Sequence, residues 1–318
     1  MTLAQATAPR EQSFDVAVPA GGVLAPCRRV PRSFLLAMLL IRRRVRGSYR
    51  LLQTIRRLGW LNRVVRYPLS DGIAIDIPLF RDENCMDATD IAAYESDLMS
   101  MLHRVLRGLS GPVAVIDGGA DIGLFTMRLV ADNTNVASVI ALEPNGAAYP
   151  WLSRNLGMLP IKSHPIQAAV GETESRGNLC NPVDDPSDHA KYVSPSGRGD
   201  VRIVRIDDIH APDPAANLLL KLDVEGAELA ALRGARLAIA QARRAIVVFE
   251  AHPRVVARTG IDPAECLRLL AGLRPFDFLV AERPGLRLSP EDGTFGQLGP
   301  GRNFNVVAVS RDSQAGAA

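Results

Sequence analysis

From residue 113 onward, short apolar runs alternate with stretches of helical periodicity, and this alternation constrains the fold more than any other feature of the chain. The runs hold few polar residues, as do strands that are buried on both faces of a parallel sheet. Regular alternation of strand and helix is typical of α/β proteins. We therefore expect an α/β fold, a mainly parallel sheet with helices on both faces. The strands of this series are expected at 113–117, 138–143, 164–170, 218–223 and 245–250.

Helices are expected before and between these strands. Apolar residues at spacings of three and four predict a helix over 90–107, with Asp90 as its N-cap and its end near Gly108. The same spacing predicts helices from about Ile122, over 146–157 and from Gly226.

Strands outside the regular series are expected in two places. The polar stretch 171–216 contains VRIVRID at 201–207, which predicts a hairpin excursion with an edge strand. The runs at 276–282 and 303–309 flank a loop rich in Gly and Pro, and they predict an antiparallel edge of the sheet.

The N-terminal region differs from the rest of the chain in charge. Residues 16–70 hold twelve Arg and no acidic residue, whereas residues 71–318 hold 24 basic and 32 acidic residues. Alternating apolar and Arg clusters over 33–61 predict one or two amphipathic helices. A basic segment of this kind is equally consistent with two interpretations. Residues 33–66 could contact an anionic membrane surface, or the segment could pack on the acidic body.

These observations divide the chain into four parts. Residues 1–32 are rich in Ala, Pro and Gly without a period, and they predict a disordered lead. Residues 33–89 form a basic appendage of helices and a hairpin, whose turn is expected at Ser70-Asp71-Gly72. The α/β domain is expected over 90–310, followed by a tail at 311–318.

Composition narrows the functional class. Aromatic residues make up 5% of the chain, so a surface that stacks nucleic-acid bases is not expected. The four Cys residues form no closely spaced pair, which disfavours a zinc knuckle and favours a reducing compartment. The longest apolar run, Phe34–Ile41, is far shorter than the roughly 20 residues of a membrane span. We expect a cytoplasmic protein, with membrane contact only at the periphery.

The first chemical motif is AVIDGGADIG, where a carboxylate at a strand tip precedes a glycine turn and a helix start. Gly119 would let backbone amides approach a ligand, and the helix start near Gly123 would favour an anionic group. Asp117 would attract a cation. The spacing differs from the dinucleotide fingerprint, and a ligand with both an ammonium and a carboxylate fits it better. An ordinary tight turn is the alternative.

Three further motifs follow later strands of the series. In ALEPN, Glu143 can accept hydrogen bonds from a ribose diol, and Pro144 stops the strand. In LLLKLDVEGAE, an acidic cluster lies at a strand tip, where at least one acid is expected to meet a ligand. In FEAHP, Glu250 and His252 are candidates for a base or for metal ligands. For each motif the alternative is a solvated loop or the first turn of a helix.

Five segments, IDGGADIG, LEPN, QAAVG, KLDVEGAE and FEAHP, in this order and spacing, resemble the FkbM family of S-adenosylmethionine-dependent methyltransferases. The resemblance covers about 90–309, and the preceding IAAYES segment resembles a Tyr-Glu helix of that family. It implies a Rossmann-like class I methyltransferase fold with a seven-stranded sheet. Asp121 departs from the pattern, because the family usually has Asn there.

The resemblance also implies roles for individual residues. Asp117 and the turn Gly119–Gly123 would hold the methionine end of the cofactor, with Tyr94 and Glu95 closing over it. The LEPN motif would hold the ribose, and QAAVG the adenine. The full set of cofactor-binding candidates is Tyr94, Glu95, Asp117, Gly119, Ala120, Asp121, Gly123, Glu143, Pro144, Asn145, Gln167 and Ala168.

The chemistry implied is methyl transfer to a hydroxyl of a sugar, a glycolipid or a polyketide-type product. An alcohol must lose its proton as it attacks, so a base is needed. The candidates for this base are Asp223, Glu225, Glu250 and His252. A divalent metal on Asp223 and Glu250 is a less favoured alternative, and no metal ligand is assigned. Other functions left open are a nicotinamide-dependent oxidoreductase and a non-catalytic nucleoside-binding or membrane-docking protein.

Overall fold

The protein is described by a computed structural model over residues 25–27, 63–79, 94–182, 191–293, 297–298 and 303–311, with isolated positions between 39 and 58. The chain divides into two compact units, Met1–Tyr94 and Glu95–Ala318, and each is described by itself.

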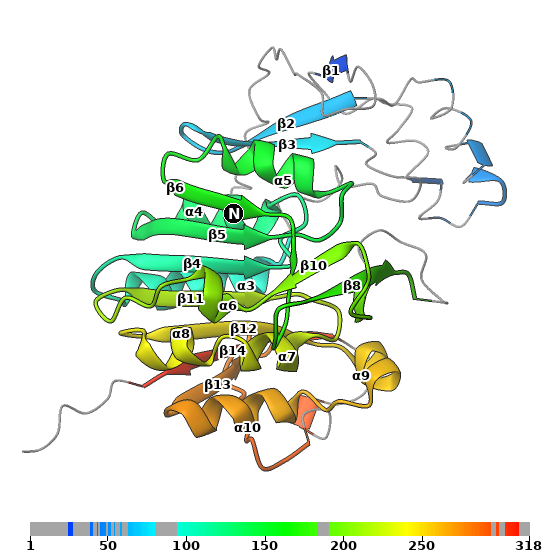
Figure 1. Cartoon of the computed structure of the whole chain (residues 1–318). Helices are drawn as coiled ribbons and strands as arrows, with labels where there is room; N and C mark the ends of the chain where they lie inside the picture. The colour runs from blue at the N-terminus through cyan, green and yellow to red at the C-terminus, as the bar shows by residue number, and fades with distance from the viewer. Residues whose placement is uncertain are drawn as a thin grey trace, which may run out of the picture. The chain divides into compact units, whose positions relative to one another are not determined.

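The second unit is built on a seven-stranded sheet (Figure 1). Every strand is parallel to the others except β14, which is antiparallel to both of its neighbours. This confirms the Rossmann-like, mainly parallel sheet. In spatial order the strands are β13 (Phe276–Val280), β14 (Phe304–Ser310), β12 (Ala245–Ala251), β11 (Asn217–Leu222), β4 (Val113–Gly118), β5 (Val136–Leu142) and β6 (Lys162–Ile166).

Helices cover both faces of this sheet, as expected from the alternation of strand and helix (Figure 1). On one face, α3 (Ser96–Arg107) packs against α4 (Leu124–Asp132). On the other face, α10 (Ala264–Leu273) packs against α7 (Glu228–Arg233) and α8 (Arg236–Gln241). The remaining helices are α5 (Tyr149–Leu156), α6 (Ile206–Ile209) and α9 (Pro253–Thr259).

The predicted start of the first helix is wrong. Tyr94 and Glu95 form a turn, and α3 begins only at Ser96, because Glu95 has the left-handed φ of 43° and cannot continue a helix. The expected cap, Asp90, lies outside the described residues. The expected end is confirmed, since Gly108 is the C-cap of α3.

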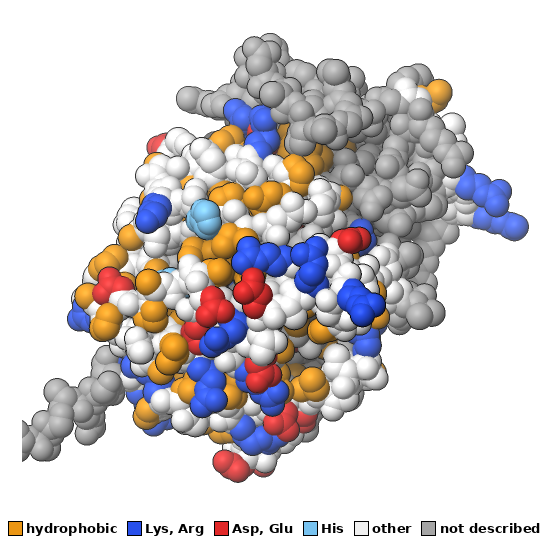
Figure 2. Space-filling model, in the orientation of Figure 1, with side chains coloured by type: hydrophobic (Ala, Val, Ile, Leu, Met, Phe, Trp, Pro, Cys, Tyr) orange, Lys and Arg blue, Asp and Glu red, His pale blue; other side chains and the backbone are white. Residues whose placement is uncertain are grey.

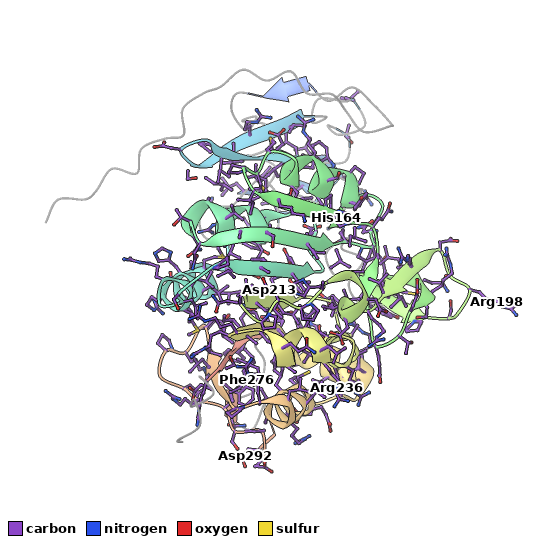
Figure 3. All side chains as sticks on the ribbon, turned by 60° about the vertical axis from the view of Figure 1, so that its left-hand side comes forward. His164, Arg198, Asp213, Arg236, Phe276 and Asp292 are labelled. Carbon is purple, nitrogen blue, oxygen red and sulfur yellow. The ribbon has the colours of Figure 1, made fainter. Side chains whose placement is uncertain are left out.

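A second sheet of four strands forms an excursion from the main fold. Its order is β7 (Ala169–Val170), β10 (Val201–Val204), β8 (Ser175–Cys180) and β9 (Tyr192–Pro195). The strand predicted over 164–170 is therefore divided between β6 and β7, which belong to different sheets. The hairpin excursion is confirmed by β8 and β9. Arg198, after β9, points away from the main sheet (Figure 3).

Of the two predicted sheet edges, one is corrected by the pairing of the strands and one is confirmed. The run 201–207 is not an edge strand, because Ile203 pairs with β7 on one side and with β8 on the other. The antiparallel edge is confirmed, because β13 is the outermost strand of the seven-stranded sheet and β14 pairs antiparallel with both β13 and β12. The apolar pattern of a strand shows that the strand is buried, but it does not show which strands pair with it.

The first unit contains a sheet of three strands, β1 (Ala25–Cys27), β2 (Arg63–Ser70) and β3 (Ile73–Pro78). The predicted hairpin is confirmed, with its turn at Asp71 and Gly72. Pairing of Ala25–Cys27 with β2 shows that the expected disordered lead is wrong at these three residues. Most of the basic segment 33–61 lies outside the described residues.

Charges of both signs are interspersed on the face of the second unit that Figure 2 shows. Ion pairs such as Arg233–Glu172 and Arg202–Glu174, each at 3.3 Å, join basic and acidic side chains of this unit. The acidic excess of the body is thus not gathered into a patch of one sign on this face. Within the described part of the chain, no helix combines the length and apolar character that a membrane span requires.

Candidate active site

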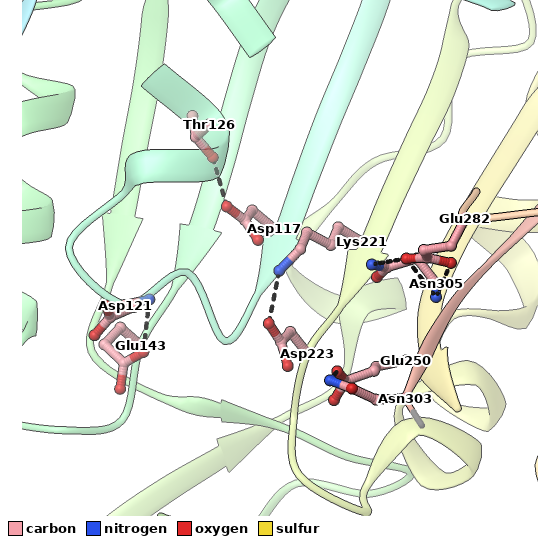
Figure 4. A network of polar contacts seen from close by, with 10 residues as sticks. All are labelled: Asp117, Asp121, Thr126, Glu143, Lys221, Asp223, Glu250, Glu282, Asn303 and Asn305. Carbon is pink, nitrogen blue, oxygen red and sulfur yellow. Dashed lines mark hydrogen bonds and ion pairs between the residues drawn. The ribbon is translucent and has the colours of Figure 1, made fainter. Parts of the chain in front are cut away.

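Four of the predicted acidic residues lie at one edge of the seven-stranded sheet, as four neighbouring strands end there (Figure 4). Asp117 and Glu250 lie near the ends of β4 and β12, whereas Glu143 and Asp223 directly follow β5 and β11. Because these strands are parallel, their carboxyl ends meet at the same edge. Ligands of open α/β sheets bind at this edge.

Asp117 is completely buried and has one unused hydrogen-bond acceptor. Its Oδ2 accepts a hydrogen bond from Thr126 Oγ1 at 2.6 Å, whereas Oδ1 has no partner. Burial raises the pKa of Asp117, and nearby Lys221 opposes the shift. A buried acceptor without a partner is unfavourable unless a ligand supplies a donor.

Lys221 is the cation around which the acidic residues gather. Its side chain is 3% exposed, and its Nζ donates to Asp223 Oδ2 at 3.0 Å. The same Nζ lies 5.0 Å from the centre of the Phe125 ring. Lys221 and Asp117 are register partners on β11 and β4. A lysine buried to this degree is stable only when it is paired, so Lys221 fixes the Asp223 carboxylate in place.

Glu95 adds a second buried carboxyl with an unused oxygen, since its Oε2 has no hydrogen-bond partner. Burial raises the pKa of Glu95, Lys221 opposes this, and Asp223 and Asp117 raise it further. These mutual effects mean that the three carboxyls surround the same Lys221 ammonium. Tyr94 belongs to the other compact unit, so its place over a cofactor stays a prediction.

The glycine turn after β4 is shaped by contact with the neighbouring loop. Gly119 has φ of +80°, and a Cβ there would lie 1.9 Å from the backbone oxygen of Asp223. The N–H groups of Gly119 and Ala120 both donate to the Leu142 carbonyl at 2.9 Å. The sequence interpretation that these amides face a ligand is therefore corrected for both residues. Gly123 takes φ of +90° directly before α4.

Glu143 joins the two loops of the predicted cofactor site. Its Oε2 accepts from the Asp121 N–H at 2.8 Å, and its Oε1 accepts from the Asn145 N–H at 2.7 Å. Both carboxylate oxygens of Glu143 therefore hold the backbone of these two loops. Pro144, which lies between Glu143 and Asn145 in the sequence, continues the loop. Asp121 is held in the left-handed region, at φ of 51°.

The two residues predicted for the adenine pocket differ in exposure. Gln167 is exposed, and its Nε2 lies 3.6 Å from the position that a Cβ on Gly146 would take. Ala168 is 0% exposed and belongs to the hydrophobic core. Gln167 therefore lies beside the loop after β5, whereas Ala168 offers a ligand only its backbone.

The loop after β11 carries the next candidate, Glu225. It has φ of 51°, and its Oε2 lies 3.7 Å from Arg258 Nη2. Burial and Asp223 raise the pKa of Glu225 to about 7, and Arg258 opposes the shift. Glu228 instead accepts from the Gly226 N–H at 3.1 Å, which agrees with a structural role in the first turn of α7.

Glu250 and His252, the remaining candidates, differ in what they can do with a proton. Burial and Asp223 raise the pKa of Glu250 to about 8, although Asn303 Nδ2 donates to its Oε1. His252 Nδ1 accepts the Arg254 N–H at 3.0 Å and caps α9. The proton of the neutral ring is then on Nε2, which becomes a donor. This geometry favours the carboxyl over the imidazole as a base.

Sequence reasoning placed Lys221 with Asp223 at a strand tip, which the ion pair confirms, but it missed three residues of this cluster: Glu282, Asn303 and Asn305. Glu282 follows β13 and accepts from the Asn305 Nδ2 at 2.9 Å. The Asn residues lie at the start of β14, which reaches this edge because β14 runs antiparallel. No motif marked these three residues, because strand order and direction bring them to the cluster.

A pocket that is partly open to solvent lies beside Glu250. Its lining is mainly apolar and includes Leu229, Phe249, Val255 and Val256. Among the described residues, no group of three or more His, Cys, Asp or Glu side chains is arranged to bind a metal ion.

Comparisons with known proteins agree with this arrangement. Residues 117–274 match the family described as the Methyltransferase FkbM domain. Methyltransferase sdnD from Sordaria araneosa is 30% identical in a match covering 38% of this chain and 59% of that protein, so the chain spans about three fifths of this relative.

Solved structures with similar folds include two methyltransferases. The structure of Methyltransferase FkbM from Methylobacillus flagellatus KT is 19% identical in sequence to this chain, with a TM-score of 0.40. The match covers 63% of this chain and 45% of the chain in that structure. Precorrin-6y C5,15-methyltransferase from Geobacter metallireducens GS-15 is 12% identical with a TM-score of 0.39, covering 78% of this chain and 100% of that one. Residues 117–274 of the chain therefore belong to the FkbM methyltransferase family.

Proposed function

We propose that this protein is an S-adenosylmethionine-dependent methyltransferase that acts on a hydroxyl group. The observation that carries the proposal is the buried acidic cluster at the sheet edge. Two of its carboxylate oxygens, Glu95 Oε2 and Asp117 Oδ1, are buried without a hydrogen-bond partner. A ligand with positive charge and N–H donors would satisfy both oxygens.

The residues present fit this cofactor in charge and in hydrogen-bonding capacity. Asp117 and Glu95 would hold the ammonium of its methionine end. Glu143, which follows β5 at the same sheet edge, would accept from the ribose hydroxyls. Gln167, exposed beside the loop after β5, would border the adenine. When bound, the cofactor supplies an activated methyl group.

We infer that Glu250 takes the proton from the acceptor hydroxyl. A general base works best when its pKa is near the working pH, and the pKa of Glu250 is about 8. Glu250 also lines the partly open pocket beside α9, from which an acceptor would approach it. Asp223 is held by Lys221 at 3.0 Å and would orient the acceptor. Alignment of this kind supplies several kcal/mol of rate acceleration, up to about 7–11 in ideal cases.

For the acceptor we propose a sugar, a glycolipid or a polyketide-type product. The largely apolar pocket wall supports an acceptor with an apolar part next to its hydroxyl. A divalent metal remains the less favoured way to activate the hydroxyl, because the Lys221 ammonium repels a cation at Asp223.

The first test is binding of S-adenosylhomocysteine to the full chain, measured by calorimetry. Asp117→Asn should weaken binding roughly 10–100-fold, because a charged hydrogen-bond acceptor is worth about 1.5–3 kcal/mol. Glu265→Gln, an exposed change on α10, is the matched control and should bind as the parent protein does. Absence of binding to the parent protein would reject the proposal. Transfer of a labelled methyl group to metabolite extracts would then identify the acceptor.

A further inference from the structure

Arg258 joins three separate elements next to the candidate base. From α9, its Nη2 donates to the backbone oxygen of Glu225 at 2.5 Å and lies 3.7 Å from the carboxylate Oε2. The side chains of Arg258 and Glu225 are 25% and 21% exposed, so solvent screens this pair only in part. One guanidinium thus contacts both the backbone and the side chain of the same residue.

The loop that Arg258 contacts has a conformation that needs support. Glu225 has φ of 51° and Gly226 has φ of +105°, both in the left-handed region. For a residue with a side chain this region is unfavourable, and contacts must compensate. A Cβ on Gly226 would lie 2.9 Å from Thr259 Cγ2, so α9 packs directly on the loop. None of the residues of α9 is buried, which makes these loop contacts important for holding the helix.

On its other side, Arg258 contacts the four-stranded sheet. Its guanidinium carbon lies 4.4 Å from the centre of the Tyr192 ring, within the range of a cation–π interaction. Tyr192 is the first residue of β9 and pairs with Cys180 of β8. Arg258 therefore contacts both the β8–β9 hairpin and the loop after β11.

Charges around Glu225 come from every element packed against it. Asp223 in the same loop, Glu228 on α7 and Glu250 on β12 are negative when ionised, and Arg258 on α9 is the cation in contact. The carboxyls raise the pKa of Glu225, and Arg258 lowers it. Displacement of the guanidinium would thus favour the protonated form of Glu225.

We propose that Arg258 is a positioning residue that links the β8–β9 hairpin to Glu225, so that the seating of the hairpin controls the charge and position of this carboxylate. The role of Glu225 in catalysis rests on the proposed function, but the link itself does not. A molecule that moves Tyr192 would therefore move Arg258 and so change the charge and position of Glu225 at the sheet edge.

The test is a carboxyl ¹³C NMR titration of the full chain labelled at Glu, with the signal of Glu225 assigned by its loss in Glu225→Gln. Arg258→Gln should move the midpoint of the Glu225 titration to higher pH by roughly one pH unit. This is the lower end of the pKa shifts that an adjacent arginine causes. Tyr192→Ala should move it in the same direction by less, and Tyr192→Phe, which keeps the ring, should leave it unchanged. Arg268→Gln, which removes an exposed ion pair with Glu265 on α10, is the control.

An unchanged midpoint in Arg258→Gln would overturn the proposal. Equal midpoints in Tyr192→Ala and Tyr192→Phe would overturn the link to the hairpin. If Arg258→Gln does not fold, the pair of Tyr192 variants decides the proposal alone. Because the titration uses neither cofactor nor acceptor, its failure is distinguishable from failure of the proposed methyl transfer.

Discussion

At the scale of single residues, the site combines one buried lysine with several carboxyls whose pKa values are raised. Lys221 neutralises part of the negative charge of Asp117, Asp223 and Glu95, and its position is fixed by the Phe125 ring and by Asp223. Burial without full neutralisation keeps protons on carboxyls near neutral pH. Such a site is suited to hold a cationic ligand and to exchange a proton with an acceptor.

Glu250→Gln should lower turnover roughly 10²–10⁴-fold, which is the usual contribution of a general base. In the parent protein, turnover should rise with pH up to about 8, because Glu250 must be ionised to accept a proton. The rate profile of the variant against pH, with the acceptor found in the transfer assay, checks this. Loss of turnover with no change in the profile would assign the base elsewhere.

The same substitution should alter how stability depends on pH. The pKa of Glu250 is raised in the folded chain from 4.5 to about 8, so its stabilising contribution is complete below about pH 4.5 and lost as pH rises through 8. Glu250→Gln should therefore lose less unfolding free energy than the parent protein between pH 5 and 8. Urea unfolding at several pH values measures the difference.

At the scale of elements, the loops after β4 and β11 depend on one another. Gly119 of the first loop touches the Asp223 carbonyl of the second, and the Asp223 N–H donates to the Gly118 carbonyl at 2.9 Å. Neither loop can move without the other. The cofactor end of the site and the acceptor end are thereby held in one arrangement.

Gly119→Ala should therefore disturb both loops, because its Cβ would need to displace the backbone of Asp223. Gly260→Ala is the matched control, since Gly260 has a similar φ of +71° but open space around it. The Gly260→Ala control should lose only roughly 1–2 kcal/mol of unfolding free energy, which is the cost of an alanine in the left-handed region. Gly119→Ala should lose more and should also weaken S-adenosylhomocysteine binding. Equal losses in the two variants would show that the loop contact is unimportant.

At the scale of the whole molecule, a basic N-terminal segment precedes a body with an acidic excess in the sequence. We propose that the segment 33–66 contacts anionic membranes, since its charge is of one sign and its apolar residues are clustered. Neutralising Arg42, Arg43, Arg44 and Arg46 with Gln should then greatly reduce flotation with anionic vesicles, at about 1 kcal/mol per charge. A control with the exposed Arg198, Arg233, Arg236 and Arg268 changed to Gln should float as the parent does. Equal flotation of the two variants would favour packing on the body instead.

Much of the α/β framework was predictable because burial of a parallel strand leaves a continuous apolar run in the sequence. The runs around Val115, Leu219 and Val247 became the central strands β4, β11 and β12, each fully buried at these positions. Strand ends were predictable too, and with them the acids at the sheet edge. The split of 164–170 into two strands was not predicted, because only Gln167 and Ala168 separate β6 from β7.

The sequence by itself determined which residues form buried strands and which acidic residues follow them, since both depend on local order along the chain. Only the tertiary structure decided that the start of β14 brings Asn303 and Asn305 to the same edge, and that Arg258 meets Tyr192. The physical reason is that these contacts depend on strand order, strand direction and burial. None of these three is a property of neighbouring residues in the chain.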